Sequence, residues 1–448
     1  MMSEEMLCRK RRLSSFQIII LGFAGVILLG ALLLMLPISA TARCVTPFHE
    51  ALFTATSAVC VTGLVVQDTG SYWSVFGQAV ILTLIQIGGL GVVTVAASFA
   101  LLSGRRISLM QRSIMQDAIS APKVGGIVRL TRFILRGTFL IELIGALAML
   151  PVFCRDYGWR GIWMAVFHSI SAFCNAGFDI LGTNNNLYPS LTGYVQNPVI
   201  NITIMLLIIT GGIGFLTWDD ICENKLHFHR YRMQSKVVVI VTLVLIVLPA
   251  LFFFFADFGA LPLEERIQAA LFQSVTLRTA GFASFNQDAL TEASKVLSDL
   301  LMFVGGSSGS TAGGVKTVTM GLVILSAVST MRGRRQVTVF GRSISQEDIA
   351  NAVSIALLVM GLSLLGAAVI TVCDGCSFMN AIYETISALC TVGLTTGITP
   401  TLCTASKLIL IVFMFFGRVG IMTIGVGFMM GDRAKERVQY AQTKVMIG

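Results

Sequence analysis

The chain has 448 residues, of which 55% are hydrophobic and only 12% are charged, and its mean hydropathy is +0.82. A soluble protein of this composition would lack the polar residues that its surface needs, so the composition indicates a protein of the lipid bilayer. The formal net charge of +9 could also suggest nucleic-acid binding. The basic residues are divided among short segments beside apolar runs, however, and this pattern argues against a nucleic-acid partner.

The first apolar run extends from Phe16 to Ile38 and follows four consecutive basic residues. It is longer than the core of a signal peptide, and no small-residue cleavage site follows it, so we expect a retained transmembrane helix. Three later runs predict helices of the same kind. They are Val128–Phe153, Val237–Phe258 and Asn351–Cys373.

A shorter apolar segment follows each of these helices and leads to a glycine with a hydrophobic residue after it. Segments of this length cannot cross a bilayer, and they are typical of half-helices that enter the membrane from one side. We predict these pore helices at Phe48–Val59, Gly161–Phe173, Leu263–Leu277 and Ser377–Leu389. The four glycines, Gly63, Gly177, Gly281 and Gly393, are 114, 104 and 112 residues apart.

A second long helix is predicted after each glycine, and it carries a glycine motif of its own. In the four units the motif begins 25, 34, 24 and 24 residues after the glycine that follows the pore helix. Glycines of this kind often serve only close helix packing, but matched positions in four units favour an internal repeat. The predicted second helices are Trp73–Leu102, Pro198–Trp218, Ser298–Ser329 and Lys407–Met430.

We therefore expect an all-α integral membrane protein with a fourfold repeat of helix, pore loop and helix, giving eight transmembrane helices and four re-entrant helices around one central pore. The repeats would cover residues 16–104, 128–219, 237–330 and 348–431. Most lysines and arginines lie in the remaining segments, 1–15, 105–127, 220–236, 331–347 and 432–448. We expect the protein in the plasma membrane, and the positive-inside rule predicts that these segments, with both termini, lie in the cytoplasm.

We expect the chain to turn back at each of the four glycines, and the resulting four hairpins have the composition of a cation filter. A potassium ion loses its water only where several oxygen atoms replace it, and main-chain carbonyls can do so if the backbone adopts dihedrals that glycine allows. The C-terminal ends of the pore helices also favour a cation. The predicted filter residues are Cys60, Val61, Thr62, Gly63, Cys174, Asn175, Ala176, Gly177, Arg278, Thr279, Ala280, Gly281, Cys390, Thr391, Val392 and Gly393.

Over nearly its whole length this pattern resembles the potassium transporter superfamily of KtrB, TrkH and the plant HKT proteins. In having a single helix before the first hairpin, the chain resembles KtrB in particular. The resemblance implies sodium-linked potassium uptake by a homodimer that binds a cytoplasmic nucleotide-binding ring similar to KtrA. It also implies that four hairpin glycines favour potassium, and that Arg278 is directed away from the ion.

The second helix of the third repeat is interrupted by ten residues of which five are glycine. Such a segment disfavours a regular helix, and its spacing does not fit a phosphate-binding loop. The resemblance implies a gating loop below the filter. We predict that Arg418, a charge inside an apolar run, belongs to this gate and needs several acceptors. The gate residues are Gly305, Gly306, Ser307, Ser308, Gly309, Ser310, Thr311, Ala312, Gly313, Gly314, Lys316 and Arg418.

Other functions fit less well. A membrane enzyme would need a cluster of His, Asp or Glu, and we interpret His168 and Glu384 as hydrogen-bonded residues of pore helices. Cys373 and Cys376 could pair or remain thiols, and they lack the partners of a zinc site. A TrkH-like potassium transporter, or a secondary transporter of another cation such as sodium, remains the alternative.

Overall fold

The computed structural model describes residues 14–102, 108–119, 125–225, 227–334 and 336–420. The described part is mostly helical, with loops between the helices and one short β-hairpin. Its helices are α1 Ser15–Met35, α2 Phe48–Val59, α3 Val75–Leu90, α4 Val92–Leu102, α5 Leu109–Ile119, α6 Ile127–Tyr157, α7 Arg160–Phe173, α8 Pro198–Gly212, α9 Phe215–Asn224, α10 Met233–Ala256, α11 Leu263–Thr276, α12 Glu292–Phe303, α13 Thr317–Met331, α14 Gln346–Asp374, α15 Phe378–Leu389 and α16 Thr404–Val419. The strands are β1 Thr338–Val339 and β2 Arg342–Ser343, which pair antiparallel.

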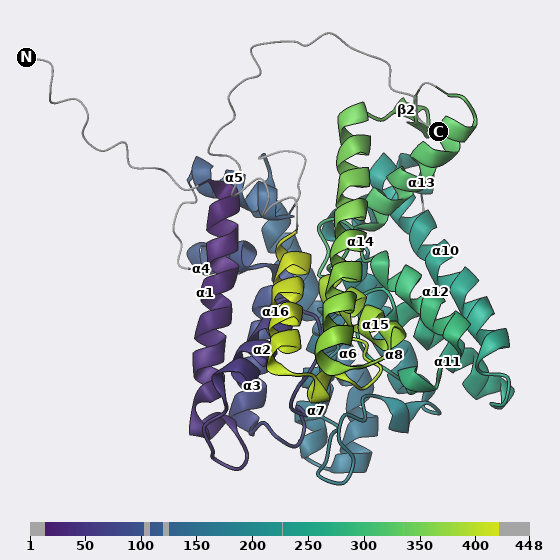
Figure 1. Cartoon of the computed structure of the whole chain (residues 1–448). Coiled ribbons are helices and arrows are strands. Elements are labelled where there is room, and N and C mark those ends of the chain that lie inside the picture. Colours follow the sequence, from purple (N-terminus) through teal and green to yellow (C-terminus); the bar gives the residue numbers. More distant parts are fainter. Residues whose placement is uncertain (1–13, 103–107, 120–124, 226, 335, 421–448) are drawn as a thin grey trace, which may run out of the picture.

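Four helices, α1, α6, α10 and α14, are long and apolar enough to cross a bilayer within the described residues. Each begins and ends within a few residues of a predicted first helix. Each also packs against the short helix that follows it, α2, α7, α11 or α15. In Figure 1 these long helices run between the two ends of the molecule, with α7 and α11 in the lower half and α5 and α13 near the top.

The short helices end where the hairpins begin. The C-caps are Cys60, Cys174, Leu277 and Cys390. We name the segments Ser57–Leu64, Ser171–Phe178, Val275–Phe282 and Ser387–Leu394 hairpins 1 to 4. The pore helices are therefore found as predicted, with α11 one residue shorter at its end.

The prediction of continuous second helices was wrong for repeats one and two. α3 and α4 meet at an angle of 97°, and α8 and α9 meet at 98°. The bends lie at Gly91 and Gly214, whose φ angles of +86° and +90° do not fit a helix. If each bent pair counts as one span, the described residues contain up to six spans.

Two further predictions need correction or fall outside the described part. Segment 105–127, expected as a loop, contains helix α5, whose Ile114, Met115 and Ile119 are buried. The last second helix, α16, begins at Thr404 and ends at Val419. The predicted continuation to Met430 and the tail 432–448 lie outside the described residues, as does most of the predicted N-terminal segment 1–15.

Candidate functional site: four hairpins and a glycine-rich loop

The four hairpin glycines form a closed ring. A Cβ added to Gly63 would lie 2.6 Å from Ala176 O, and one added to Gly177 would lie 2.8 Å from the Cα of Gly281. The same construction on Gly281 reaches Val392 O at 2.6 Å, and on Gly393 it reaches Thr62 O at 2.0 Å. Each glycine thus touches the backbone of the next hairpin, and the fourth returns to the first.

The hairpins share one backbone conformation. Their glycines have φ angles of +100°, +69°, +78° and +91° in chain order. The residue two places earlier also has a positive φ in every hairpin, between +52° and +62°, although none of these residues is glycine. They are Val61, Asn175, Thr279 and Thr391. Strained backbone of this kind persists only where the surrounding structure holds it, and it is common at functional sites.

Side chains of the pore helices hold the hairpins in this shape. The hydroxyls of Ser57 and Ser387 accept hydrogen bonds from Gly63 N and Gly393 N, both at 3.1 Å. In hairpin 2 the hydroxyl of Ser171 donates to a main-chain carbonyl, Phe178 O, at 2.7 Å. These short local contacts connect the start of each of these hairpins with its end.

The residue three places before each glycine is buried. Arg278 is 4% exposed, and its guanidinium donates to Thr242 Oγ1 of α10 at 3.2 Å. Its side chain therefore extends to a neighbouring transmembrane helix. The cysteines at the same position, Cys60, Cys174 and Cys390, are free thiols, and so are Cys373 and Cys376.

A cavity of about 550 Å³ lies over the ring and is lined by all four glycines. Asp68 and Asp179 also line it. Asp68 accepts hydrogen bonds from Ser71 N at 2.8 Å and Tyr188 N at 2.9 Å. Asp179 is partly buried, and burial, together with the charge of Asp68, raises the pKa of its carboxyl to about 7. The cavity thus presents carboxylates directly above the hairpins.

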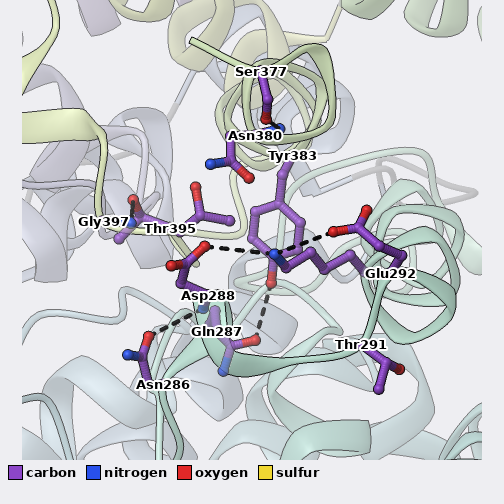
Figure 2. Close-up of polar contacts among 12 residues, drawn as sticks. Asn286, Gln287, Asp288, Thr291, Glu292, Ser377, Asn380, Tyr383, Thr395 and Gly397 are labelled. Atoms are coloured by element: carbon purple, nitrogen blue, oxygen red, sulfur yellow. Dashed lines mark hydrogen bonds and ion pairs between the residues drawn. The ribbon is translucent and has the colours of Figure 1, made fainter.

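One hydrogen bond connects repeats three and four beside this cavity, and ion pairs lie next to it (Figure 2). The hydroxyl of Tyr383 on α15 donates to Gln287 Oε1 at 3.0 Å. Lys295, whose side chain is 8% exposed, lies 3.5 Å from Asp288 and 3.8 Å from Glu292. The hydrogen bond of Tyr383 links the segment before α12 to the pore helix of the fourth repeat, and the ion pair of Lys295 with Asp288 attaches α12 to that same segment.

The glycine-rich segment Gly305–Gly314, here called the gate loop, is not helical. It folds back on itself, with Gly305 N donating to Val315 O at 2.8 Å. Ser307 N donates to Gly212 O at 2.9 Å, which attaches the loop to α8. A Cβ on Gly313 would lie 1.9 Å from Thr391 Oγ1, so the loop also lies directly against hairpin 4.

Arg418 connects the gate loop to the first repeat. Its guanidinium donates to Thr311 O, to Gly88 O and, at 3.2 Å, to Gly89 O. The predicted need for several acceptors is thus met by main-chain carbonyls. Lys316 donates to Ala312 O at 2.8 Å within the same region.

A second cavity, of about 410 Å³, lies beside the gate loop. Gate-loop residues line it together with Lys316 and Arg418, and α5 contributes Asp117 and Ile119. A Cβ on Gly309 would lie 2.7 Å from Ile119 O, so α5 contacts the loop directly. In the predicted orientation the cavity over the ring is the outer cavity and the second cavity is the inner cavity, and gate-loop residues line the inner cavity and not the outer one.

Two buried pore-helix residues make the hydrogen bonds that the sequence analysis expected of them. His168 Nδ1 lies 2.7 Å from Met164 O, and Glu384 accepts from Thr399 Oγ1 at 2.7 Å. The sequence analysis missed Asp68, Asp179 and the α5 contact. The two aspartates follow their hairpin glycines by five and two residues, and this proximity could have indicated them.

Comparisons with known proteins agree with this architecture. The profile of the TrkH family, described as "Cation transport protein", matches residues 9–436. The potassium/sodium uptake protein NtpJ of Enterococcus hirae is 37% identical over 98% of both chains. Ktr system potassium uptake protein B of Bacillus subtilis is 38% identical over 96% of both chains.

A solved structure shows a similar fold. The crystal structure of the potassium transporter TrkH from Vibrio parahaemolyticus superposes with a TM-score of 0.73 at 18% identity, covering 93% of this chain and 86% of that one. The resemblance inferred from the hairpin motifs is confirmed, and the family consists of transporters and not of enzymes. The chain is a multi-pass membrane protein that belongs to the TrkH family of cation transport proteins.

Proposed function

We propose that this chain is the potassium-translocating subunit of an uptake system, and that hairpins 1 to 4 form its selectivity filter as four repeats around one pore. The closed ring of Gly63, Gly177, Gly281 and Gly393 is the observation that carries this proposal. A dehydrated potassium ion needs oxygen ligands on several sides. Four hairpins of one conformation, each touching the next, supply main-chain carbonyls in such an arrangement.

Electrostatics supports a cation as the cargo. All four pore helices end at the hairpins, so their partially negative ends lie at the ring. Asp68 and Asp179 add acidic groups to the outer cavity, where they would attract cations. Potassium as the main cargo is supported by the name of the Bacillus subtilis relative and by glycine at all four positions, which the family resemblance associates with potassium. The name of NtpJ includes both potassium and sodium. Sodium would act as a coupling or activating ion.

The gate loop and Arg418 would close the path below the filter. Arg418 adds a positive charge beside the inner cavity and holds Thr311 by a hydrogen bond. An entering cation would meet both the loop and this charge, so conduction requires the contacts to break. The glycines of the loop lower the cost of that movement.

The assembly would be a homodimer with a cytoplasmic nucleotide-binding ring, similar to KtrA, bound in trans. The names of the Ktr system relatives support a system of several components. The loop around Arg230 and Lys236 and the segment near Arg332 would face this partner in the cytoplasm. Tight ATP binding by the purified chain alone would count against a separate regulatory subunit.

Complementation tests the function. A bacterium without potassium uptake systems, expressing this chain with its partner, should grow at micromolar to millimolar potassium, and sodium should improve growth. Growth that never exceeds that of the empty vector would reject potassium uptake. Sodium uptake that potassium does not inhibit would favour the alternative, a sodium transporter.

A further inference from the structure

An acidic residue lies at mid-length of the membrane-spanning helix α6, and the proposed filter and gate do not include it. Glu142 is 5% exposed. An ionisable side chain at membrane depth costs a few kcal/mol, ~2.5–3.5 on insertion scales, and therefore marks a candidate functional residue. Its carboxylate accepts from one described side chain, the amide of Gln86 on α3, at 3.0 and 3.3 Å.

Gln86 contacts hairpin 2 as well as Glu142. Its Oε1 accepts a hydrogen bond from the thiol of Cys174 at 3.8 Å. Cys174 caps α7 and is the first predicted filter residue of hairpin 2. The NH₂ group of Gln86, the only donor of this amide, faces both carboxyl oxygens of Glu142. The carbonyl of the amide is then left to face Cys174.

The main chain of Glu142 supports the same unit. Its carbonyl oxygen accepts from Ser169 Oγ of the pore helix α7 at 2.6 Å. Cys174 is also tightly packed, since a Cβ on Gly89 would lie 2.5 Å from its sulfur. One residue of α6 thus holds the pore helix through its backbone and the filter hairpin through its side chain.

Hairpin 3 has an analogous connection. There Arg278, also three places before the glycine, donates to Thr242 on α10, the long helix of its own repeat. In hairpin 2 the connection to α6 goes through Gln86. Both contacts therefore tie the first filter residue outward to a transmembrane helix.

We propose that Glu142 is a positioning residue of the filter, which acts through Gln86 to fix Cys174 and with it the carbonyls of hairpin 2. This inference rests on the proposed potassium filter. It assigns to Glu142 an effect on ion affinity and selectivity, and not on the gate or on membrane insertion.

The test uses an isosteric substitution of Glu142 and a double variant in which the residues at positions 142 and 86 are exchanged. Glu142→Gln keeps volume but lets Gln86 pair in either orientation, so the thiol of Cys174 loses its fixed acceptor. We expect the half-saturating potassium concentration to rise about tenfold, equivalent to about 1.4 kcal/mol, and potassium-over-sodium selectivity to fall. The maximal rate and the amount of protein in the membrane should stay within about twofold, because the gate loop is not changed.

The exchanged pair, Glu142→Gln with Gln86→Glu, again gives Cys174 a fixed acceptor, now a carboxylate at position 86, and should recover most of the affinity. Cys174→Ala removes the donor and leaves Glu142 paired, so it should reproduce the Glu142→Gln effect and add nothing to it. It also provides the test if Glu142→Gln does not reach the membrane.

Wild-type affinity and selectivity in both Glu142→Gln and Cys174→Ala would overturn the inference, as would an exchanged pair no better than the single variant. Gly177→Ser, measured in parallel, separates this failure from that of the proposed function. If Gly177→Ser itself keeps wild-type affinity and selectivity, the filter assignment is wrong, whatever Glu142 does.

Discussion

Alanine at the ring glycines should impair uptake in an order set by the contacts between hairpins. Gly393 has a φ of +91°, and an added Cβ would lie 2.0 Å from Thr62 O and 2.9 Å from the Cα of Gly63. Both obstacles are backbone atoms of hairpin 1, so hairpins 1 and 4 would have to separate. At Gly177 the φ is +69°, and the nearest atom is 2.8 Å away, so a smaller shift would suffice.

The dihedral cost alone sets a lower limit. A left-handed conformation costs an alanine about 1–2 kcal/mol, which is a factor of about 5–30 in an equilibrium. We expect the half-saturating potassium concentration of Gly177→Ala to rise by at least this factor. That of Gly393→Ala should rise at least about tenfold further, because the steric clash adds to the strain.

Gly397 is the matched control. Its φ of +95° is close to that of Gly393, but a Cβ there meets nothing within 4 Å. Gly397→Ala thus has similar strain without the clash. Uptake of rubidium by cells at a series of potassium concentrations, corrected for membrane protein, gives the comparison. Equal effects of Gly393→Ala and Gly397→Ala would refute a ring of mutually contacting hairpins.

Three further predictions concern residues around the filter. Because burial and Asp68 raise the pKa of Asp179 to about 7, this carboxyl gains charge as pH rises from 6 to 8, so apparent potassium affinity measured by uptake should rise roughly threefold. Asp179→Asn should hold the low-pH affinity at both pH values, and a persisting pH dependence would exclude this group. Shortening the gate loop or changing Arg418 to Ala should raise the maximal uptake rate with affinity unchanged, and additive effects in the double variant would show that they act independently. Glu384→Gln weakens the contact of this side chain with Thr399 and should lower the free energy of unfolding by about 1–3 kcal/mol. An unchanged free energy of unfolding would contradict a structural role.

The sequence predicted the elements that depend on local pattern. The four pore helices follow from short apolar segments before Gly63, Gly177, Gly281 and Gly393, and their ends agree with the structure to within a residue or two. The acceptors of Arg418 were predicted in kind, because a buried guanidinium must find oxygen atoms.

Tertiary contacts explain what was missed. The bends at Gly91 and Gly214 arise inside apolar runs that read equally well as continuous helices, since hydropathy does not register a change of direction. The contact of helix α5 with Gly309 joins residues that are far apart in the sequence. The link from Glu142 to Cys174 joins residues 32 positions apart through Gln86 of another repeat, and no local pattern indicates such a contact.

The central claim is that the ring of four hairpins binds potassium. Anomalous diffraction from crystals of the protein soaked with thallium(I), a heavy monovalent substitute for potassium, tests it most directly. The account predicts a peak on the axis enclosed by Thr62, Ala176, Ala280 and Val392, which excess potassium removes and sodium does not. A peak elsewhere in the molecule and none within this ring would contradict it.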